Sequence, residues 1–249
     1  MDQRSSRRRR EPLSRERVVD AALAQADAQG LEAVTVRGLA RSLGVEPMSI
    51  YHWAASRDEI VGAIVDHVVE QIELPAAGSS WRDGIRACAI SAHRVLRQHP
   101  WACNLLMAGP RVSPPRLRQI DALLAQLDAA DLPPELGDLA YHAIDSHILG
   151  FTLWEAGYTR GLAPLRGAEL EAFLRALHLE RYPHLQAHAA WHEQPRTSSQ
   201  PNEFEFKLDL ILDGIERLRD APAFAAMPPG AESSRPPAAA EPADASAGR

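Results

Sequence analysis

The run "PMSIYH" at residues 47–52 places several kinds of DNA-contacting side chain side by side. The Ser49 hydroxyl can donate to or accept from any base edge, and Met48 or Pro47 can touch a thymine methyl group. Tyr51 and His52 can reach phosphate oxygens. These residue types are typical of a surface that reads duplex DNA.

Two short helices must position these side chains. Thr35 is expected to cap a helix over residues 36–43, which Gly44 ends. Pro47 suits the first position of a following helix over residues 47–53, with Ile50 facing inward and its other side chains outward. Two short helices joined by a tight turn predict a helix-turn-helix, in which the second helix enters the major groove. Arg37, early in the first of the pair, then reaches a phosphate or a base edge.

The same segment also fits an ordinary bundle of three small helices, since singly exposed apolar residues such as Met48 need no special role. A helix over residues 14–29 is expected to precede the pair. Another is expected over residues 57–73, behind a capping box of Ser56 and Glu59. The free N–H groups at the start of that last helix, at Arg57, suit a phosphate of DNA. The negative charges of Asp58 and Glu59 would repel an anion at the same place.

Charge is unevenly distributed along the 249 residues. The whole chain carries a net charge of -6, whereas its first 17 residues hold seven arginines against three acidic residues, a local excess of +4. Residues 1–12 therefore form either a disordered arm that contacts DNA or a solvated tail. Residues 221–249, rich in Pro, Ala and Ser, predict a disordered tail.

The remaining composition narrows the protein class. No apolar run is long enough to span a bilayer, and no apolar segment follows the basic start, so we expect neither a membrane protein nor a secretory signal. Two cysteines, Cys88 and Cys103, cannot form a disulfide framework and indicate reduced thiols, hence a cytoplasmic location. No cofactor is expected.

Apolar residues recur at helical spacing throughout, which predicts an all-α fold. The break "LPAAGSS" separates an N-terminal helix-turn-helix domain, residues 13–74, from a larger helical ligand-binding and dimerisation domain, residues 75–220. Helices of the second domain are expected over residues 81–98, 101–107, 115–129, 134–155, 167–179, 183–192 and 203–219.

The last expected helix carries a heptad-like seam of Phe204, Leu208, Ile211, Ile215 and Leu218. Phe206, Leu210 and Leu212 widen this seam, so the helix is expected to meet both its own core and a partner. A second apolar stripe lies over residues 134–155. A purely intramolecular core explains either stripe by itself, but the two stripes together with a DNA-binding motif favour a two-fold homodimer.

Polar groups among these helices suggest a pocket for a small molecule. The candidates are His67, His93, Asn104, Met107, His147, Phe151 and Trp154. Each of them is, taken singly, more often a core or surface residue. His184, His188 and His192 share a helical spacing, but no cysteine or carboxylate completes a metal site. No readable nucleophile or acid–base motif supports an enzyme, although His142 and Asp145 leave a small helical enzyme as an alternative.

The segment "TVRGLARSLGVEPMSIYHWAASRDEIVGAIVD" closely resembles the DNA-binding segment of the TetR family of bacterial transcriptional regulators. The matching positions are Thr35, Arg37, Leu39, Ala40, Leu43, Gly44, Val45, Ile50, Tyr51, His52 and Trp53. The likeness spans residues 14–74. "WRDGIRACAISAHRVLRQHPW" and "NEFEFKLDLILDGIERL" resemble, more loosely, the C-terminal domain of tetracycline repressors.

The resemblance implies an all-α homodimeric repressor that binds a palindromic operator and that a small-molecule inducer releases. It implies DNA contacts at Arg37, Pro47, Met48, Ser49, Tyr51, His52 and Arg57. Two departures matter: His52 and Trp53 reverse the family's aromatic–His order, and "PWACNLLMAGP" lacks the histidine that holds the tetracycline-bound metal. The alternative to a regulator is a helical adaptor without sequence-specific DNA binding.

Overall fold

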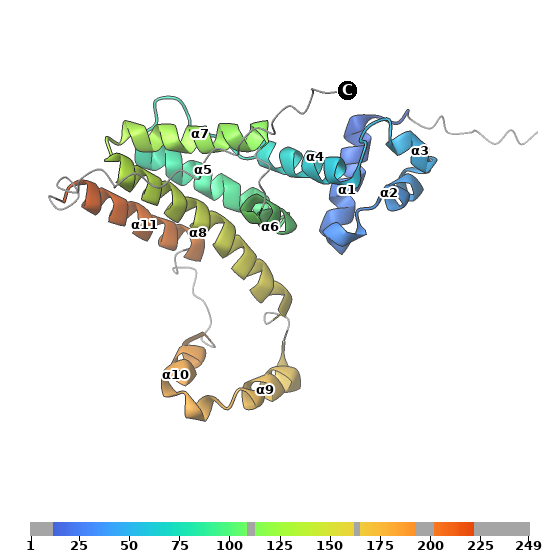
Figure 1. The fold of residues 1–249 in the computed structure, drawn as a ribbon. Coiled ribbons are helices and arrows are strands. Elements are labelled where there is room, and N and C mark those ends of the chain that lie inside the picture. The colour runs from blue at the N-terminus through green and yellow to red at the C-terminus, as the bar shows by residue number, and fades with distance from the viewer. Residues whose placement is uncertain (1–11, 109–112, 162–164, 193–201, 222–249) are drawn as a thin grey trace, which may run out of the picture.

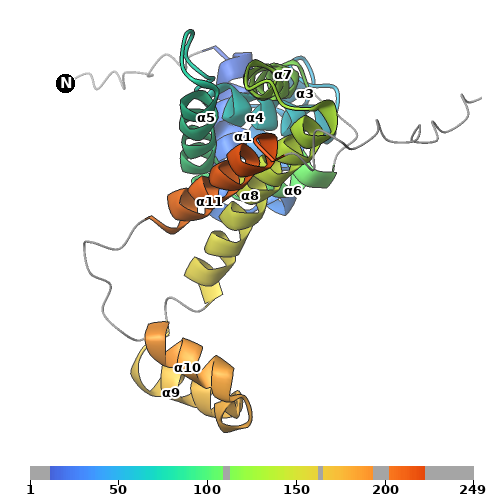
Figure 2. The same cartoon turned by 90° about the vertical axis from the view of Figure 1, so that its left-hand side faces the viewer.

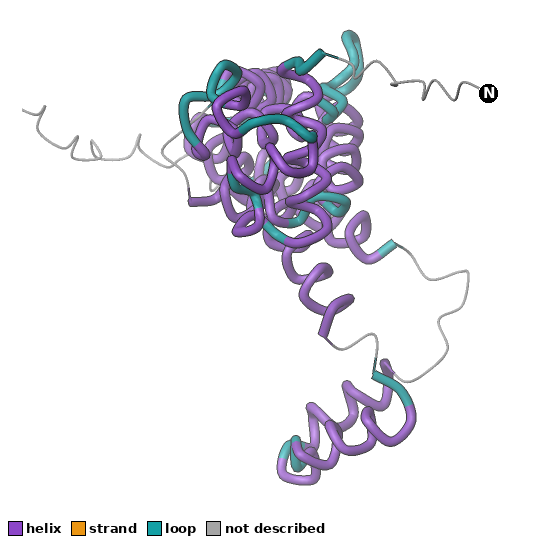
Figure 3. The backbone as a smooth tube through the Cα atoms, turned by 90° about the vertical axis from the view of Figure 1, so that its right-hand side faces the viewer, coloured by secondary structure: helices purple, strands orange, loops and turns teal. Residues whose placement is uncertain are grey.

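The computed structural model describes residues 12–108, 113–161, 165–192 and 202–221. Within these ranges every regular element is a helix and none is a strand (Figure 3). This confirms the all-α expectation. The expected basic arm, apart from Pro12, and the expected tail, apart from Ala221, lie outside the described residues.

The N-terminal bundle contains α1 (Arg15–Gln29), the 3₁₀ turn η1 (Leu31–Ala33), α2 (Val36–Leu43), α3 (Pro47–Ile50) and the first half of α4 (Arg57–Glu70). α1 packs against α2 and α4. The bundle has an apolar core of its own, which includes the buried Ala22, Leu39, Ile50, Ile60 and Ile64.

The C-terminal body is built around α5 (Trp81–Leu96), which packs against α7 (Pro114–Ala129), α8 (Pro134–Gly161) and α11 (Glu203–Arg219). α6 (Trp101–Ala108) packs against α8 and α4. α8 and α11 lie side by side, and α2 and α3 lie at the opposite end of the molecule from α11 (Figure 1). Because Val68 and Val69 of α4 belong to the core of the body while Ile64 belongs to the bundle, α4 joins the two cores.

α9 (Gly167–Ala176), the 3₁₀ turn η2 (Leu179–Arg181) and α10 (Pro183–His192) lie away from the body (Figures 1 and 2). No side chain described between residues 165 and 190 is buried. Phe173, Leu177, Tyr182 and Leu185 are among its exposed large apolar residues. This pair of helices therefore adds nothing to the core of the single chain.

Several expected helix ends were wrong. α5 ends at Leu96 and α9 at Ala176, two and three residues before their expected ends. α8 continues to Gly161, six residues beyond the expected end at Glu155, because a single glycine such as Gly157 costs a helix only about 1 kcal/mol. α3 ends at Ile50 and is followed by a turn through Trp53, and α4 ends at Glu70.

No helix in the described ranges is long and apolar enough to cross a membrane.

Candidate functional site

The short helix α3 presents the expected face. Ile50 is fully buried and Ala54 nearly so, and the Ile50 carbonyl accepts hydrogen bonds from the amides of Trp53 and Ala54 at 2.9 and 3.2 Å. These two anchors hold the segment against the bundle. Met48 is 71% exposed and Tyr51 47% exposed, so both side chains are available to a partner.

The other predicted contact residues of this segment share that surface. His52 is exposed, and Pro47 and Ser49 are half-buried. Pro47 occupies the first helical position, where its fixed φ angle suits the helix and its missing N–H costs nothing. The local sequence thus builds a rigid support for outward-facing side chains.

α2 is fixed at both ends by local contacts. The Thr35 hydroxyl accepts a hydrogen bond from the Gly38 amide at 3.0 Å, which satisfies one free N–H of the first turn. Gly44 has φ +66°, a left-handed conformation that glycine adopts without strain. Arg37 is exposed in the first turn of α2, where the sequence predicted a DNA contact.

The side chain of Arg57 forms hydrogen bonds within its own bundle. Its Nε donates to the Val34 carbonyl at 2.8 Å and its Nη2 to the Leu31 carbonyl at 2.7 Å. The guanidinium therefore ties the start of α4 to the turn after α1. These backbone carbonyls occupy two of its five donor groups. The DNA contact expected of Arg57 stays a prediction, and the structure adds a structural role that the sequence did not indicate.

The start of α4 is also poorly suited to a phosphate. The Ser56 hydroxyl accepts from the Glu59 amide at 3.2 Å, and the Glu59 carboxylate accepts from the Ala55 amide at 2.6 Å. Asp58 adds a second carboxylate in the first turn. Negative side chains thus already occupy the positive end of this helix.

In the body, four of the predicted ligand residues belong to one aromatic cluster: His93 from α5 and His147, Phe151 and Trp154 from α8. Phe204 of α11 completes it. The Phe204 ring stacks on His93 with centroids 4.1 Å apart and on His147 with centroids 4.7 Å apart. Phe151 contacts all three of these rings and Trp154.

Hydrogen bonds fix the two imidazoles in this cluster. The Thr152 hydroxyl donates to the Ile148 carbonyl, so its oxygen accepts from Nδ1 of His93 at 3.0 Å. Nε2 of His147 donates to the Phe204 carbonyl at 3.0 Å. Burial lowers the pKa of His93 to about 4, helped by the charges of Arg97 and His147. Burial also lowers the pKa of His147. Both rings are therefore neutral at pH 7.

The remaining candidates lie outside this cluster. His67 is half-buried on α4, and Asn104 and Met107 are exposed on α6. Lys207, which no sequence pattern indicated, places its ammonium 4.9 Å from the Phe151 ring centre and 5.2 Å from that of Trp154. Phe204 was expected only in the dimer seam. Helical spacing links the residues of α8, but no local pattern connects them to α11.

The predicted dimer seam is corrected by burial. Phe204, Leu208 and Ile215 are 1%, 0% and 5% exposed and belong to the core of the chain itself. Ile211 is half-buried against the same core, and Leu218 is exposed. The free apolar side chains of α11 are instead Phe206, Leu210 and Leu218, because the face of this helix that meets α8 is already used.

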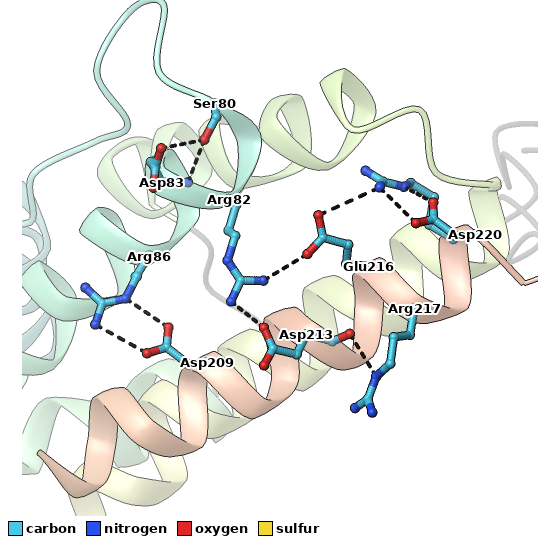
Figure 4. A network of polar contacts seen from close by, with 10 residues as sticks. Ser80, Arg82, Asp83, Arg86, Asp209, Asp213, Glu216, Arg217 and Asp220 are labelled. Carbon is cyan, nitrogen blue, oxygen red and sulfur yellow. Dashed lines mark hydrogen bonds and ion pairs between the residues drawn. The ribbon is translucent and has the colours of Figure 1, made fainter. Parts of the chain in front are cut away.

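Ion pairs between α5 and α11 fix that choice of face (Figure 4). Arg82 pairs with Asp213 and Glu216, and Arg86 pairs with Asp209 at 2.9 Å and Glu205 at 2.7 Å. The hydrogen bond that Arg86 donates to Asp209 is the largest cause that raises the pKa of Arg86. Two arginines of α5 thus hold one edge of α11.

Within the described ranges, the structure gives the residues of α10 and the two cysteines no metal or thiolate chemistry. Among the described residues, no three His, Cys, Asp or Glu side chains are arranged to hold a metal ion. Cys88 and Cys103 are free thiols in the core. Burial raises the pKa of Cys88 to about 11 and that of Cys103 to about 12, which leaves little reactive thiolate at pH 7.

Comparison with known proteins agrees with this architecture. Residues 18–64 match the family model for bacterial regulatory proteins of the tetR family, and residues 74–219 match that for the tetracyclin repressor-like C-terminal domain. The HTH-type transcriptional repressor DrrR1 of Streptomyces coeruleorubidus is 30% identical over 225 residues, which cover 86% of this chain and 82% of DrrR1.

Solved structures share the fold. The regulator SCO7222, a TetR from Streptomyces coelicolor, has a TM-score of 0.65 and 28% identity over 84% of this chain and 100% of its own. The TetR family protein ActR of the same organism, in complex with actinorhodin, has a TM-score of 0.65 and 24% identity over 83% of this chain and 98% of its own. The chain belongs to the TetR family of bacterial transcriptional regulators, with a helix-turn-helix domain followed by a tetracycline-repressor-like domain.

Proposed function

We propose that this regulator is a repressor that binds a palindromic operator as a homodimer and leaves it when an organic small molecule binds. The observation that carries the proposal is the outward face of α3 and the turn after it, with Met48 and Tyr51 exposed above the buried Ile50. In a helix-turn-helix this is the face that enters the major groove. DrrR1 is named a transcriptional repressor, which supports the same role here. Such a regulator works where the DNA is, in the cytoplasm.

Exposed apolar residues support the dimer. Phe206, Leu210 and Leu218 of α11 and Leu139 of α8 are all more than 40% exposed. The two helices pack side by side, so these residues extend over neighbouring elements. Burying them against the same surface of a second copy would remove them from water and place two α3 helices for two operator half-sites.

The aromatic cluster supports an effector with a planar aromatic part. Trp154 stacks on Tyr158 with centroids 5.8 Å apart at the exposed end of the cluster. Oε2 of Glu155 is buried without a hydrogen-bond partner in the described residues, 3.5 Å from Nε2 of His93. Because Nδ1 of the neutral His93 carries the proton, both atoms are acceptors. An amino group on the effector would donate to both of them, and a hydroxyl group to one of them.

The operator test begins with a library of random duplexes, from which the full chain selects its binding sites. We expect a palindromic sequence to be enriched. Ser49→Ala and Tyr51→Ala should each weaken binding to it by ~1–3 kcal/mol, the usual worth of a base or buried phosphate contact. Ser146→Ala and Tyr182→Ala, at exposed positions in α8 and directly after η2, are the matched controls. Failure of the wild-type chain to enrich any sequence would favour the adaptor alternative.

The selected duplex also tests the effector. Planar aromatic compounds bearing hydroxyl or amino groups are screened for release of the bound duplex. Trp154→Ala should lose the response to an active compound and keep its affinity for the duplex in the compound's absence. Linkage requires the duplex to weaken compound binding by the same factor by which the compound weakens duplex binding. Equal compound affinity with and without duplex would contradict release by the effector.

A further inference from the structure

The bundle and the body meet at few points besides α4. Only two apolar side chains in the described ranges pack against both cores while lying outside α4: Leu23 of α1 and Trp101 of α6. Trp101 is the first residue of α6. A change in the position of α6 therefore reaches α1 at this point as well as reaching α4.

A polar contact lies beside these two side chains. Asp27 stands one helical turn after Leu23 on α1. Its Oδ1 atom accepts hydrogen bonds from Nε1 of Trp101 at 2.7 Å and from Nδ1 of His99 at 2.8 Å. His99 is buried at the corner between α5 and α6, with Pro100 between it and Trp101. A single carboxylate oxygen of the bundle thus holds both sides of this corner.

Apolar contacts alone would let α1 slide over α6, because they have little directional preference. Two hydrogen bonds to one carboxylate oxygen are directional, and bonds to a charged acceptor are stronger than those between neutral groups. The Ala102 amide donates to the His99 carbonyl at 2.9 Å, so the corner that supplies both donors is itself held in place. Movement of the start of α6 must therefore carry α1 with it or break both bonds.

We propose that Asp27, His99 and Trp101 form a latch that sets the position of the helix-turn-helix relative to the body. The inference rests on the proposed function. Asp27 is a positioning residue in this account and does not touch DNA. The latch fixes the bundle on each copy of the dimer, and hence the separation of the two α3 helices.

The test uses two variants of the full chain. Trp101→Phe keeps an aromatic ring between the cores but removes the indole donor and part of the ring volume, while Asp27→Ala removes the acceptor. Trp81→Phe is the matched control, because Trp81 packs against the core of the body alone. In the absence of DNA, amide hydrogen exchange should become about tenfold faster in residues 26–29 and 99–102 of both latch variants. The double variant should exchange no faster than Asp27→Ala, because the two changes break the same contact.

The second measurement distinguishes positioning from local stability. Each protein is bound to its selected duplex and to the same duplex lengthened by one central base pair. The wild-type chain and Trp81→Phe should discriminate strongly between them. The latch variants should bind the original duplex about tenfold more weakly and discriminate less, because their bundles adapt to either spacing.

Unchanged exchange in both variants would overturn the latch. So would faster exchange with wild-type discrimination between the two duplexes, because the contact would then be only a local one. If the wild-type chain binds no duplex, the proposed function fails, and hydrogen exchange alone then decides whether Asp27 links α1 to α6.

Discussion

The DNA-binding bundle and the body are both all-helical, but their polar contacts join residues at very different separations along the chain. In the bundle, the hydroxyls of Ser14, Thr35 and Ser56 each accept from an amide three residues ahead. In the body, the contacts of His93, His147 and Arg82 with α8 or α11 join residues 59, 57 and 131 positions apart. The caps of the bundle thus depend on neighbours in sequence, with the bonds of Arg57 as its long-range exception, whereas the polar contacts that join the helices of the body come from distant segments.

This difference has a functional consequence. A recognition surface must have a fixed shape, and short-range caps with a small buried core provide it. A domain that responds to an effector needs packing that can adopt a second arrangement, and contacts between distant helices can be exchanged without unfolding any one helix. Substitutions in the bundle and in the body are therefore expected to differ in the size of their effects and in the property that they change.

The largest effect is expected at α11, where Phe204 and Phe206 stand two residues apart with opposite surroundings. Phe204→Ala should lower the free energy of unfolding by ~3–5 kcal/mol, because the ring is buried between two imidazoles. Phe206→Ala should leave the stability of the single chain nearly unchanged and weaken the dimer. Denaturant titration and light scattering measure the two quantities. Equal losses of stability in both variants would contradict the assignment of these two faces.

Two arginines of the bundle provide the next comparison. Arg57→Ala should cost ~1.5–3 kcal/mol of stability, because it removes bonds from a charged donor to the carbonyls of Leu31 and Val34. Arg37→Ala should leave stability unchanged and weaken binding to the selected duplex. Thermal unfolding and duplex titration separate the two roles. An Arg57→Ala protein that keeps its stability but binds the duplex poorly would show that Arg57 acts mainly as the DNA contact that the sequence predicts.

Arg57 also shows how far the sequence could lead. Caps, the Gly44 turn and the buried Ile50 are encoded within a few residues, so the helix-turn-helix and its outward face were predictable. The carbonyls of Leu31 and Val34 become partners of Arg57 only after α4 folds back on the turn after α1, across 26 and 23 residues. No pattern within a few residues of Arg57 indicates these long-range contacts.

The body shows the same limit more strongly. The apolar repeat of α11 predicts a packing seam, but a repeat by itself does not indicate whether the helix packs against its own chain or against another copy. Burial of Leu208 and Ile215 against the body decides this, since Arg82 and Arg86 orient the helix from α5. Likewise, the sequence indicates His93 and His147 only as separate candidates, whereas in the structure the Phe204 ring packs against both imidazoles.

The smallest expected effect concerns pH and again separates the two regions. In the body, burial lowers the pKa of His93 to about 4 from its ordinary value of 6.5, so the folded state favours the neutral ring. The contribution of His93 to stability is complete above pH 6.5 and is lost as the pH falls from 6.5 toward 4. Between pH 7 and pH 5 this loss amounts to about 2 kcal/mol. His147, with a pKa lowered by burial, acts in the same direction.

Denaturant titrations at the two pH values should therefore show a smaller difference in the free energy of unfolding for His93→Gln than for the wild-type chain. His52→Gln, at an exposed position of the bundle, should keep the wild-type difference. An undiminished loss in His93→Gln would mean that acid destabilises the body through other groups, and that the stacked imidazole of α5 is not what makes the body more sensitive to acid than the bundle.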